Sequence, residues 1–119
     1  MAGTDMISGL SVELAKKFSE LWHMVGNTPM LELQYEYQGK AGKIYVKCEH
    51  YNLTGSVKDR VALYIIYQAH KNDAIKPGDT IVAAASDNTG ISFSTIGKAL
   101  ATMWLSLCPI GWVRSGKTL

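Results

Sequence analysis

The sequence predicts an α/β fold in which a parallel sheet is flanked by helices. Segments with the apolar spacing of helices alternate with short apolar runs of the kind found in buried strands. From residue 43 onward the order is strand, helix, strand, helix, strand. Such alternation favours parallel strands joined by right-handed crossovers. With 119 residues, the chain is long enough for one domain at most.

The first expected helix covers residues 10–24, where the apolar side chains fall on one stripe that would face a core. These are Leu10, Leu14, Phe18, Leu21 and Trp22. Gly and Pro residues over 26–29 then interrupt the chain. The alternating sequence LELQYEY (31–37) predicts a half-exposed strand.

The remaining elements follow from the same two patterns. They are a turn over 38–42, a strand over 43–49, a helix over 56–72, a short apolar strand over 80–85, a helix over 88–101 and a strand over 103–108. Because the helix over 56–72 is apolar around much of its surface, we expect it to pack on the sheet.

Composition excludes several classes of function. The net charge is only +2 without a run of like charges, so neither nucleic acid nor a membrane surface is an expected partner. The N-terminus lacks the basic start and following apolar run of a signal peptide. We therefore expect a cytoplasmic protein. Cys48 and Cys108 are expected to be buried reduced thiols. The three histidines have no partner at metal-ligand spacing, so no metal site is expected.

Two loops are candidates for a ligand site. In a parallel sheet, ligands bind where the loops leave the carboxyl ends of the strands. HYNLTG (50–55) and SDNTG (86–90) are both expected at that edge, each running into a helix. We therefore expect these loops to be neighbours in space.

The first loop places Lys58 in the opening turn of a helix. Ser56 as the N-cap and Asp59 as the acid of a capping box would explain their own positions, but not that of the lysine. A cation is unfavourable at the positive end of a helix dipole, which favours the neutral amine. A neutral amine can form a Schiff base with an aldehyde cofactor. Chance placement of the lysine is the alternative.

The second loop, Ser86 to Gly90, combines hydroxyl groups and an amide with the free N–H groups of a helix start. This combination suits a carboxylate or a phosphate. The alternative is an N-cap by Ser86 or Asp87 with nothing bound.

Together the motifs resemble the cysteine synthase and cystathionine beta-synthase family, which are pyridoxal-phosphate enzymes of fold type II. The resemblance runs over residues 25–101 and rests on three stretches in order. They are VGNTPMLEL (25–33), IYVKCEHYNLTGSVKDR (44–60) and IKPGDTIVAAASDNTGI (75–91). The resemblance implies pyridoxal phosphate as the cofactor, an amino acid as the substrate, and the homodimeric assembly typical of the family.

The resemblance also implies residue roles. Lys58 corresponds to the lysine that holds the cofactor and moves the substrate's alpha proton. Asn88 corresponds to the asparagine that bonds the cofactor's ring hydroxyl. The loop of Ser86, Asp87, Asn88 and Thr89 corresponds to the site for the amino acid's carboxylate. The implied reaction is beta-replacement on O-acetylserine or serine, giving cysteine or a thioether amino acid by transferase or lyase chemistry.

This sequence departs from the family pattern at several positions. Leu53 replaces a proline, while Ala83 and Ala85 replace a glutamate and a hydroxyl residue. Asp87 replaces a glycine and adds an anion where a carboxylate should dock, which should weaken substrate binding. The family's catalytic domain is also far longer. The resemblance therefore implies a truncated N-terminal portion that is not fully active alone.

Two other functions remain as alternatives. The chain could be a non-catalytic remnant or interaction module with exposed apolar surface. A phosphate-loop nucleotide-binding protein is the remote alternative, because Gly111–Thr118 fits G-x-x-x-x-G-K-[ST]. That loop needs a following helix to complete its anion site, and only Leu119 follows.

The organisation we expect is an N-terminal helix region (1–24), a family-like segment (25–101) and a divergent tail (102–119). Codons can be chosen for Trp104 to Lys117 so that the same bases, translated in another reading frame, encode the peptide A-I-F-M-P-D-W-M-G-E-E-R-K. That peptide resembles the family's M-P-x-x-M-S-x-E-R segment, so a frameshift would explain the tail. The nucleotide sequence from codon 101 onward tests this. Codons that encode no family-like segment in any frame would refute it.

Overall fold

The computed structural model describes residues 9–85 and 87–107. Its elements are α1 (Val12–Met24), β1 (Met30–Tyr37), β2 (Lys40–Lys47), the short 3-10 helix η1 (Glu49–Tyr51), α2 (Lys58–Lys71), β3 (Thr80–Ala84), α3 (Asn88–Ala99) and β4 (Met103–Leu107). Each helix and strand expected from the sequence is present, with ends shifted by a few residues. Cys108 and the phosphate-loop match at 111–118 lie outside the described residues.

The core lies between the three helices. α1 begins at Ser11, whose hydroxyl accepts the N–H of Leu14 at 3.3 Å. Its apolar stripe then contributes Phe18, which packs edge-on against Tyr67 of α2 with ring centroids 5.5 Å apart. Ile96 of α3 is fully buried in the same cluster. Burying a side chain of this size stabilises the fold by about 1.5–3 kcal/mol.

The strands form two separate pairs. β1 and β2 are antiparallel, from Met30 opposite Lys47 to Tyr37 opposite Lys40. β3 and β4 are parallel, with Thr80 beside Met103. The prediction that residues 43–49 join a parallel sheet with residues 80–85 is therefore wrong.

The physical reason is the turn between β1 and β2. Gln38 and Gly39 have φ angles of 51° and 72°, so both central residues of a two-residue turn are left-handed. A turn of this type matches the twist of a hairpin and joins adjacent strands. Pairing with the neighbouring strand closes the shortest loop and therefore loses the least chain entropy.

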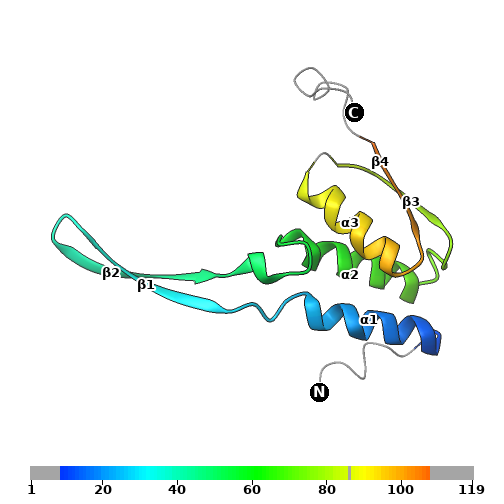
Figure 1. The fold of residues 1–119 in the computed structure, drawn as a ribbon, viewed down its shortest axis with the longest axis horizontal. Helices are drawn as coiled ribbons and strands as arrows, with labels where there is room; N and C mark the ends of the chain where they lie inside the picture. The colour runs from blue at the N-terminus through cyan, green and yellow to red at the C-terminus, as the bar shows by residue number, and fades with distance from the viewer. Residues whose placement is uncertain (1–8, 86, 108–119) are drawn as a thin grey trace.

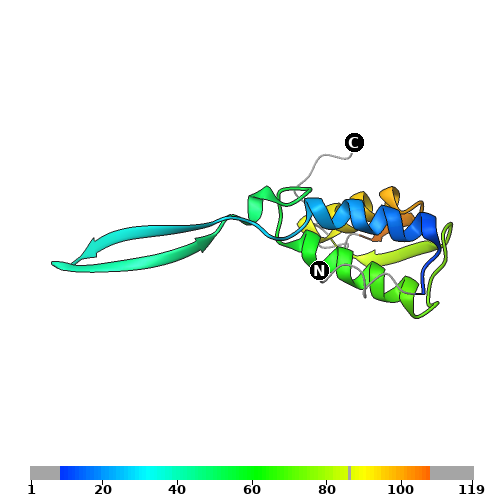
Figure 2. The same ribbon diagram turned by 90° about the horizontal axis from the view of Figure 1, so that it is seen from below.

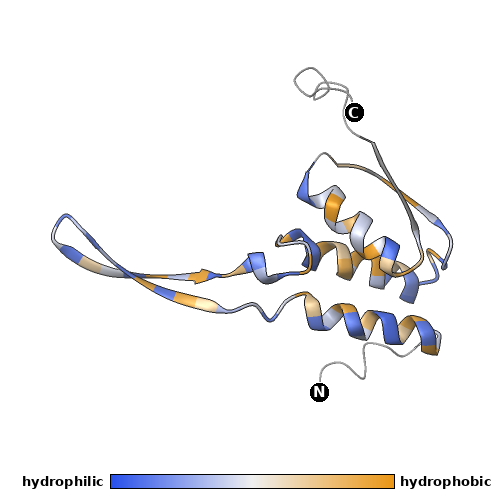
Figure 3. Cartoon of the chain, in the orientation of Figure 1, coloured by the Kyte–Doolittle hydropathy of each residue, from blue (hydrophilic) through white to orange (hydrophobic). Residues whose placement is uncertain are grey.

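The β1–β2 hairpin extends away from the helical body (Figures 1 and 2). None of its residues is buried; all but Gly42 are exposed, and Gly42 is half-buried. Orange, apolar segments alternate with blue, polar ones along both strands (Figure 3). The hairpin therefore contributes nothing to the core.

α2 packs against α3, and Ile81 of β3 packs against the core cluster to which α2 contributes Leu63 and Ile66. Part of its apolar surface, including Val61, Tyr64 and Ile65, is exposed. The N-terminal ends of α2 and α3 lie at the same end of the helical body, the end from which the hairpin leaves (Figure 1). Within the described ranges, no helix combines the length and apolar character needed to cross a membrane.

Candidate functional site

An ion pair between Glu49 of η1 and Arg60 of α2 joins the loop to the helix that follows it. Arg60 Nε lies 2.7 Å from Glu49 Oε2, and Arg60 Nη2 donates to Oε1 at 2.9 Å. Two parallel bonds of this kind fix both position and orientation. Thr28 adds a third segment, because its hydroxyl donates to Glu49 Oε1 at 2.7 Å and accepts from Arg60 Nη2 at 3.1 Å.

The buried amide of Asn52 extends this network. Its Oδ1 accepts the N–H of Gly26 at 2.7 Å. Its Nδ2 donates to the backbone oxygen and to Oε2 of Glu49, both at 2.8 Å. Gly26 has a φ of 89° and Asn27 a φ of 47°, so the chain turns here through left-handed conformations before β1. Asn52 thus holds that turn against η1.

These contacts set the protonation of Glu49. Hydrogen bonds from Arg60 first, then from Thr28 and Asn52, lower the pKa of the Glu49 carboxyl from 4.5 to about 2. The same pairing raises the pKa of Arg60. Both groups are therefore charged throughout the physiological range.

A second polar cluster shapes the loop before α2. Asp59 is fully buried, and its carboxylate accepts both the N–H and the hydroxyl of Thr54 at 2.6 Å. The Thr54 hydroxyl lies 3.4 Å from the Ser92 hydroxyl of α3. A buried carboxylate needs such donors to offset its lost hydration. The contact with Ser92 brings residues 50–55 beside α3.

The capping box expected around Ser56 is not what the structure shows. The Ser56 hydroxyl accepts the N–H of Lys58 at 3.1 Å, as a cap does. The Asp59 carboxylate, however, binds Thr54 and not Ser56. Asp59 is fully buried, and Thr54 supplies the two donors that its carboxylate accepts there.

Lys58 is the first residue of α2, and its side chain is exposed. In the described part of the chain, no hydrogen bond or ion pair engages its amine. Ser56 and Asp59 hold the backbone on either side of Lys58. The position from which the lysine side chain projects is therefore fixed. The lysine is therefore available to an external group.

The second predicted group opens α3. Asn88 is its first residue and is exposed, while Thr89 is half-buried. Asp87 is the N-cap, and its Oδ1 accepts the N–H of Thr89 at 3.4 Å. Its carboxylate thus occupies one of the free donors of the helix start. Ser86 lies outside the described residues.

Sequence reasoning passed over the residues that organise this end of the molecule. Thr28, Glu49, Asn52, Thr54 and Ser92 were assigned no role, although four of them fall within the quoted motifs. The available signal was their clustering. Short polar side chains concentrated beside two glycines, at the starts of helices and strands, indicate a hydrogen-bond network.

Comparison with known proteins gives a consistent picture. A family model described as pyridoxal-phosphate dependent enzyme matches residues 21–103. The cysteine synthase of Staphylococcus aureus is 42% identical over 81 residues, which are 68% of this chain and 26% of that protein. The O-ureido-L-serine synthase of Streptomyces lavendulae is 39% identical over 82 residues, 69% of this chain and 25% of that protein.

A solved structure agrees. The hydrogen sulfide-producing enzyme of Fusobacterium nucleatum superposes with a TM-score of 0.73 and 48% identity, over 76% of this chain and 27% of that one. The chain therefore spans about a quarter of the length of the proteins it matches.

We predict that Glu49→Gln lowers stability near neutral pH and reduces its loss on acidification. A carboxylate with a lowered pKa stabilises the fold above pH 4.5, and this contribution disappears as pH falls to about 2. Urea midpoints of the wild type and the variant should therefore differ most near neutral pH and converge near pH 2. Glu36→Gln, on the exposed hairpin, is the matched control. A gap between wild type and Glu49→Gln that is independent of pH would contradict the network.

Proposed function

Because this chain belongs to the family of pyridoxal-phosphate-dependent enzymes, we propose that it is the lysine-bearing portion of a cysteine synthase-like enzyme. The observation that carries the proposal is Lys58. Its exposed amine stands at the start of α2, in the loop that Asp59 and Thr54 hold in place. A lysine at a helix N-terminus whose amine has no hydrogen-bond or ion-pair partner among residues 9–85 and 87–107 suits attachment of an aldehyde cofactor.

The functional groups present, an amine and a side-chain amide, are of the types that bind this cofactor. Lys58 would hold it, and Asn88 at the start of α3 would bond its ring hydroxyl. Both lie at the end of the body where α2 and α3 begin (Figure 1). When bound, pyridoxal phosphate supplies an electron sink for charge formed at the alpha carbon of an amino acid. The Lys58 amine is the group that would move the alpha proton.

The substrate proposal rests on the loop before α3. Ser86, Asp87, Asn88 and Thr89 would receive the carboxylate of an amino acid, aided by the free N–H groups of the helix start. Asp87 adds a negative charge there, and its capping bond to Thr89 uses one of those donors. We therefore propose weak amino-acid binding compared with a glycine at this position.

The reaction class follows from the relatives. They include cysteine synthases and an O-ureido-L-serine synthase, and these names state different products. We propose a beta-replacement on O-acetylserine or serine. The chain spans about a quarter of the length of those proteins, and the residues it contributes to the proposed site are those for cofactor attachment and the substrate carboxylate.

A second function, a non-catalytic interaction module, is favoured by one specific observation. Large apolar side chains on β1, β2 and α2 are exposed, among them Leu33, Ile44 and Tyr64. Exposed apolar surface of this extent marks association sites in folded proteins. The two functions do not exclude each other, because Lys58 and the hairpin occupy different parts of the molecule.

We predict that Lys58 attaches pyridoxal phosphate in preference to other lysines. After the cofactor is added and the bond is reduced with borohydride, peptide mass spectrometry should find the adduct on Lys58. The expected preference over Lys71, at the opposite end of α2, is about tenfold or more, or about 1.4 kcal/mol.

Two variants separate specific from random labelling. Lys58→Ala should remove the imine absorbance of the unreduced sample, whereas Lys71→Ala should leave it. Equal labelling of Lys58 and Lys71 would refute the assignment and leave only the shared ancestry.

A further inference from the structure

Three side chains form a chain of hydrogen bonds that runs from α2 to α3. The Thr54 hydroxyl donates to the Asp59 carboxylate at 2.6 Å and lies 3.4 Å from the Ser92 hydroxyl. A hydroxyl has a single proton, and Thr54 gives its proton to Asp59, so Ser92 is the donor in the second contact. Asp59 and Ser92 are both fully buried. In such a setting each bond polarises and strengthens the next.

The two ends of this chain adjoin the residues proposed to hold the cofactor. Asp59 directly follows Lys58 at the start of α2. Ser92 lies four residues after Asn88 in α3, and residues four apart share one face of a helix. Because Ser92 contacts Thr54, the face of α3 that carries Asn88 is turned toward the loop that leads into Lys58. The chain of hydrogen bonds therefore connects the helix start that carries the amine to the one that carries the amide.

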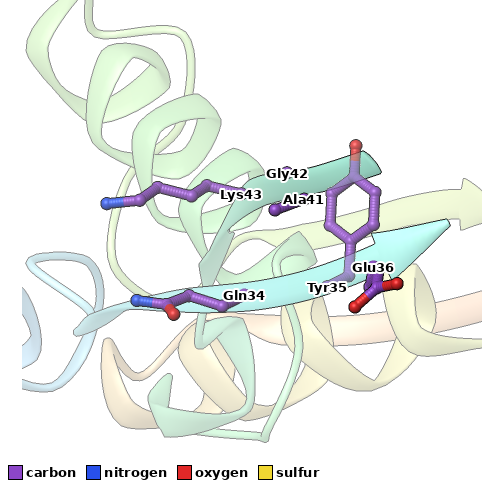
Figure 4. Close-up of a pocket in the computed structure, with 6 residues that line it drawn as sticks. All are labelled: Gln34, Tyr35, Glu36, Ala41, Gly42 and Lys43. Carbon is purple, nitrogen blue, oxygen red and sulfur yellow. The ribbon is translucent and has the colours of Figure 1, made fainter. Parts of the chain in front are cut away.

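The hollow in the hairpin is not part of this site. It has a volume of about 350 Å³ and is lined by residues of both strands, including Tyr35 and Gly42, close to the turn between β1 and β2 (Figure 4). The hairpin extends away from the helical body, so the hollow is remote from the starts of α2 and α3 (Figure 1). The place of a group attached to Lys58 therefore depends on the contacts between the two helix starts.

We propose that Ser92 is a positioning residue for the cofactor, because it sets where the Asn88 amide lies relative to the Lys58 amine. Ser92 is buried and acts through Thr54 on the loop and through the helix on Asn88. A ligand held at two points binds tightly only when both points are fixed at the separation it requires. This inference rests on the proposed function and adds to it a residue outside the carboxylate loop.

The first measurement is the affinity of the full chain for pyridoxal phosphate, obtained by titrating the imine absorbance. Ser92→Ala removes the donor to Thr54 and should weaken the affinity by roughly five- to tenfold, the effect of losing one neutral hydrogen bond. Ser94→Ala is the matched control. It makes the same change two residues further along α3, at a half-buried position, and should leave the affinity within about twofold of wild type.

A double-mutant cycle separates positioning from a general loss of stability. If Ser92 acts through Asn88, Asn88→Ala alone should weaken cofactor binding, and the addition of Ser92→Ala should weaken it no further. A role confined to the stability of the fold predicts that the two losses multiply.

A pair of variants at Thr54 gives a measurement that does not depend on how well Ser92→Ala folds. Thr54→Ser keeps the hydroxyl and should retain most of the affinity that Thr54→Val, which is similar in shape to threonine but has no hydroxyl, loses. Equal affinities of these two variants would overturn the proposal.

The remaining outcomes distinguish this inference from the proposed function. Imine absorbance that does not depend on Lys58 would overturn both. Lys58-dependent absorbance with an unchanged affinity in Ser92→Ala, an equal loss in Ser94→Ala, or losses that multiply in the double variant would overturn the role of Ser92. In those three cases the attachment of the cofactor to Lys58 would stand.

Discussion

The ion pair between Glu49 and Arg60 is the contact on which the arrangement of this molecule depends. It joins η1 to the first turn of α2. The same carboxylate binds Thr28, which precedes β1, and Asn52, the residue that ends η1. The entry to the hairpin, the loop after it and the start of α2 are therefore held by one group. Because Lys58 lies two residues before Arg60, the position of its backbone follows from this pairing.

A single carboxylate that serves three partners makes these segments interdependent. Asn52 is buried, and loss of its amide would leave the Gly26 N–H without a partner and remove one of the two donors to Glu49 Oε2. An unsatisfied buried group costs about 1–3 kcal/mol. The second cluster, Asp59 with Thr54, connects the same loop to α3 through Ser92. These polar contacts thus hold the starts of α2 and α3, which the proposed function requires, in position relative to each other.

Much of the secondary structure could be predicted because it depends on local patterns. The apolar stripe of Leu14, Phe18 and Leu21 has helical spacing and is buried as that spacing requires. The partner of residues 43–49 could not be predicted in this way. Periodicity reports which side chains face a neighbour, but not which strand supplies the hydrogen bonds. The turn at Gln38 and Gly39 decided the pairing.

The positions of the candidate residues at helix starts could be predicted, whereas the contacts around them could not. Motif resemblance singled out Lys58 and Asn88, and the structure places both at helix starts on one end of the body. The role of Asp59 was not visible locally. A capping box is a pattern within one helix, whereas the buried Asp59 binds Thr54, which in turn contacts Ser92 of α3, far along the chain. A contact with a distant element lies outside what short-range spacing encodes.

A double-mutant cycle on Asn52 and Arg60 tests the central claim most directly. These residues act on each other through Glu49, so the unfolding free energies of Asn52→Ala, Arg60→Met and the double variant should not add. Members of one network typically couple by roughly 0.5–3 kcal/mol. Asn52→Ala combined with Lys17→Met, which removes an exposed ion pair of α1, is the control and should be additive. Additive effects of Asn52→Ala and Arg60→Met would contradict the account, because the carboxylate would then not unite the three segments.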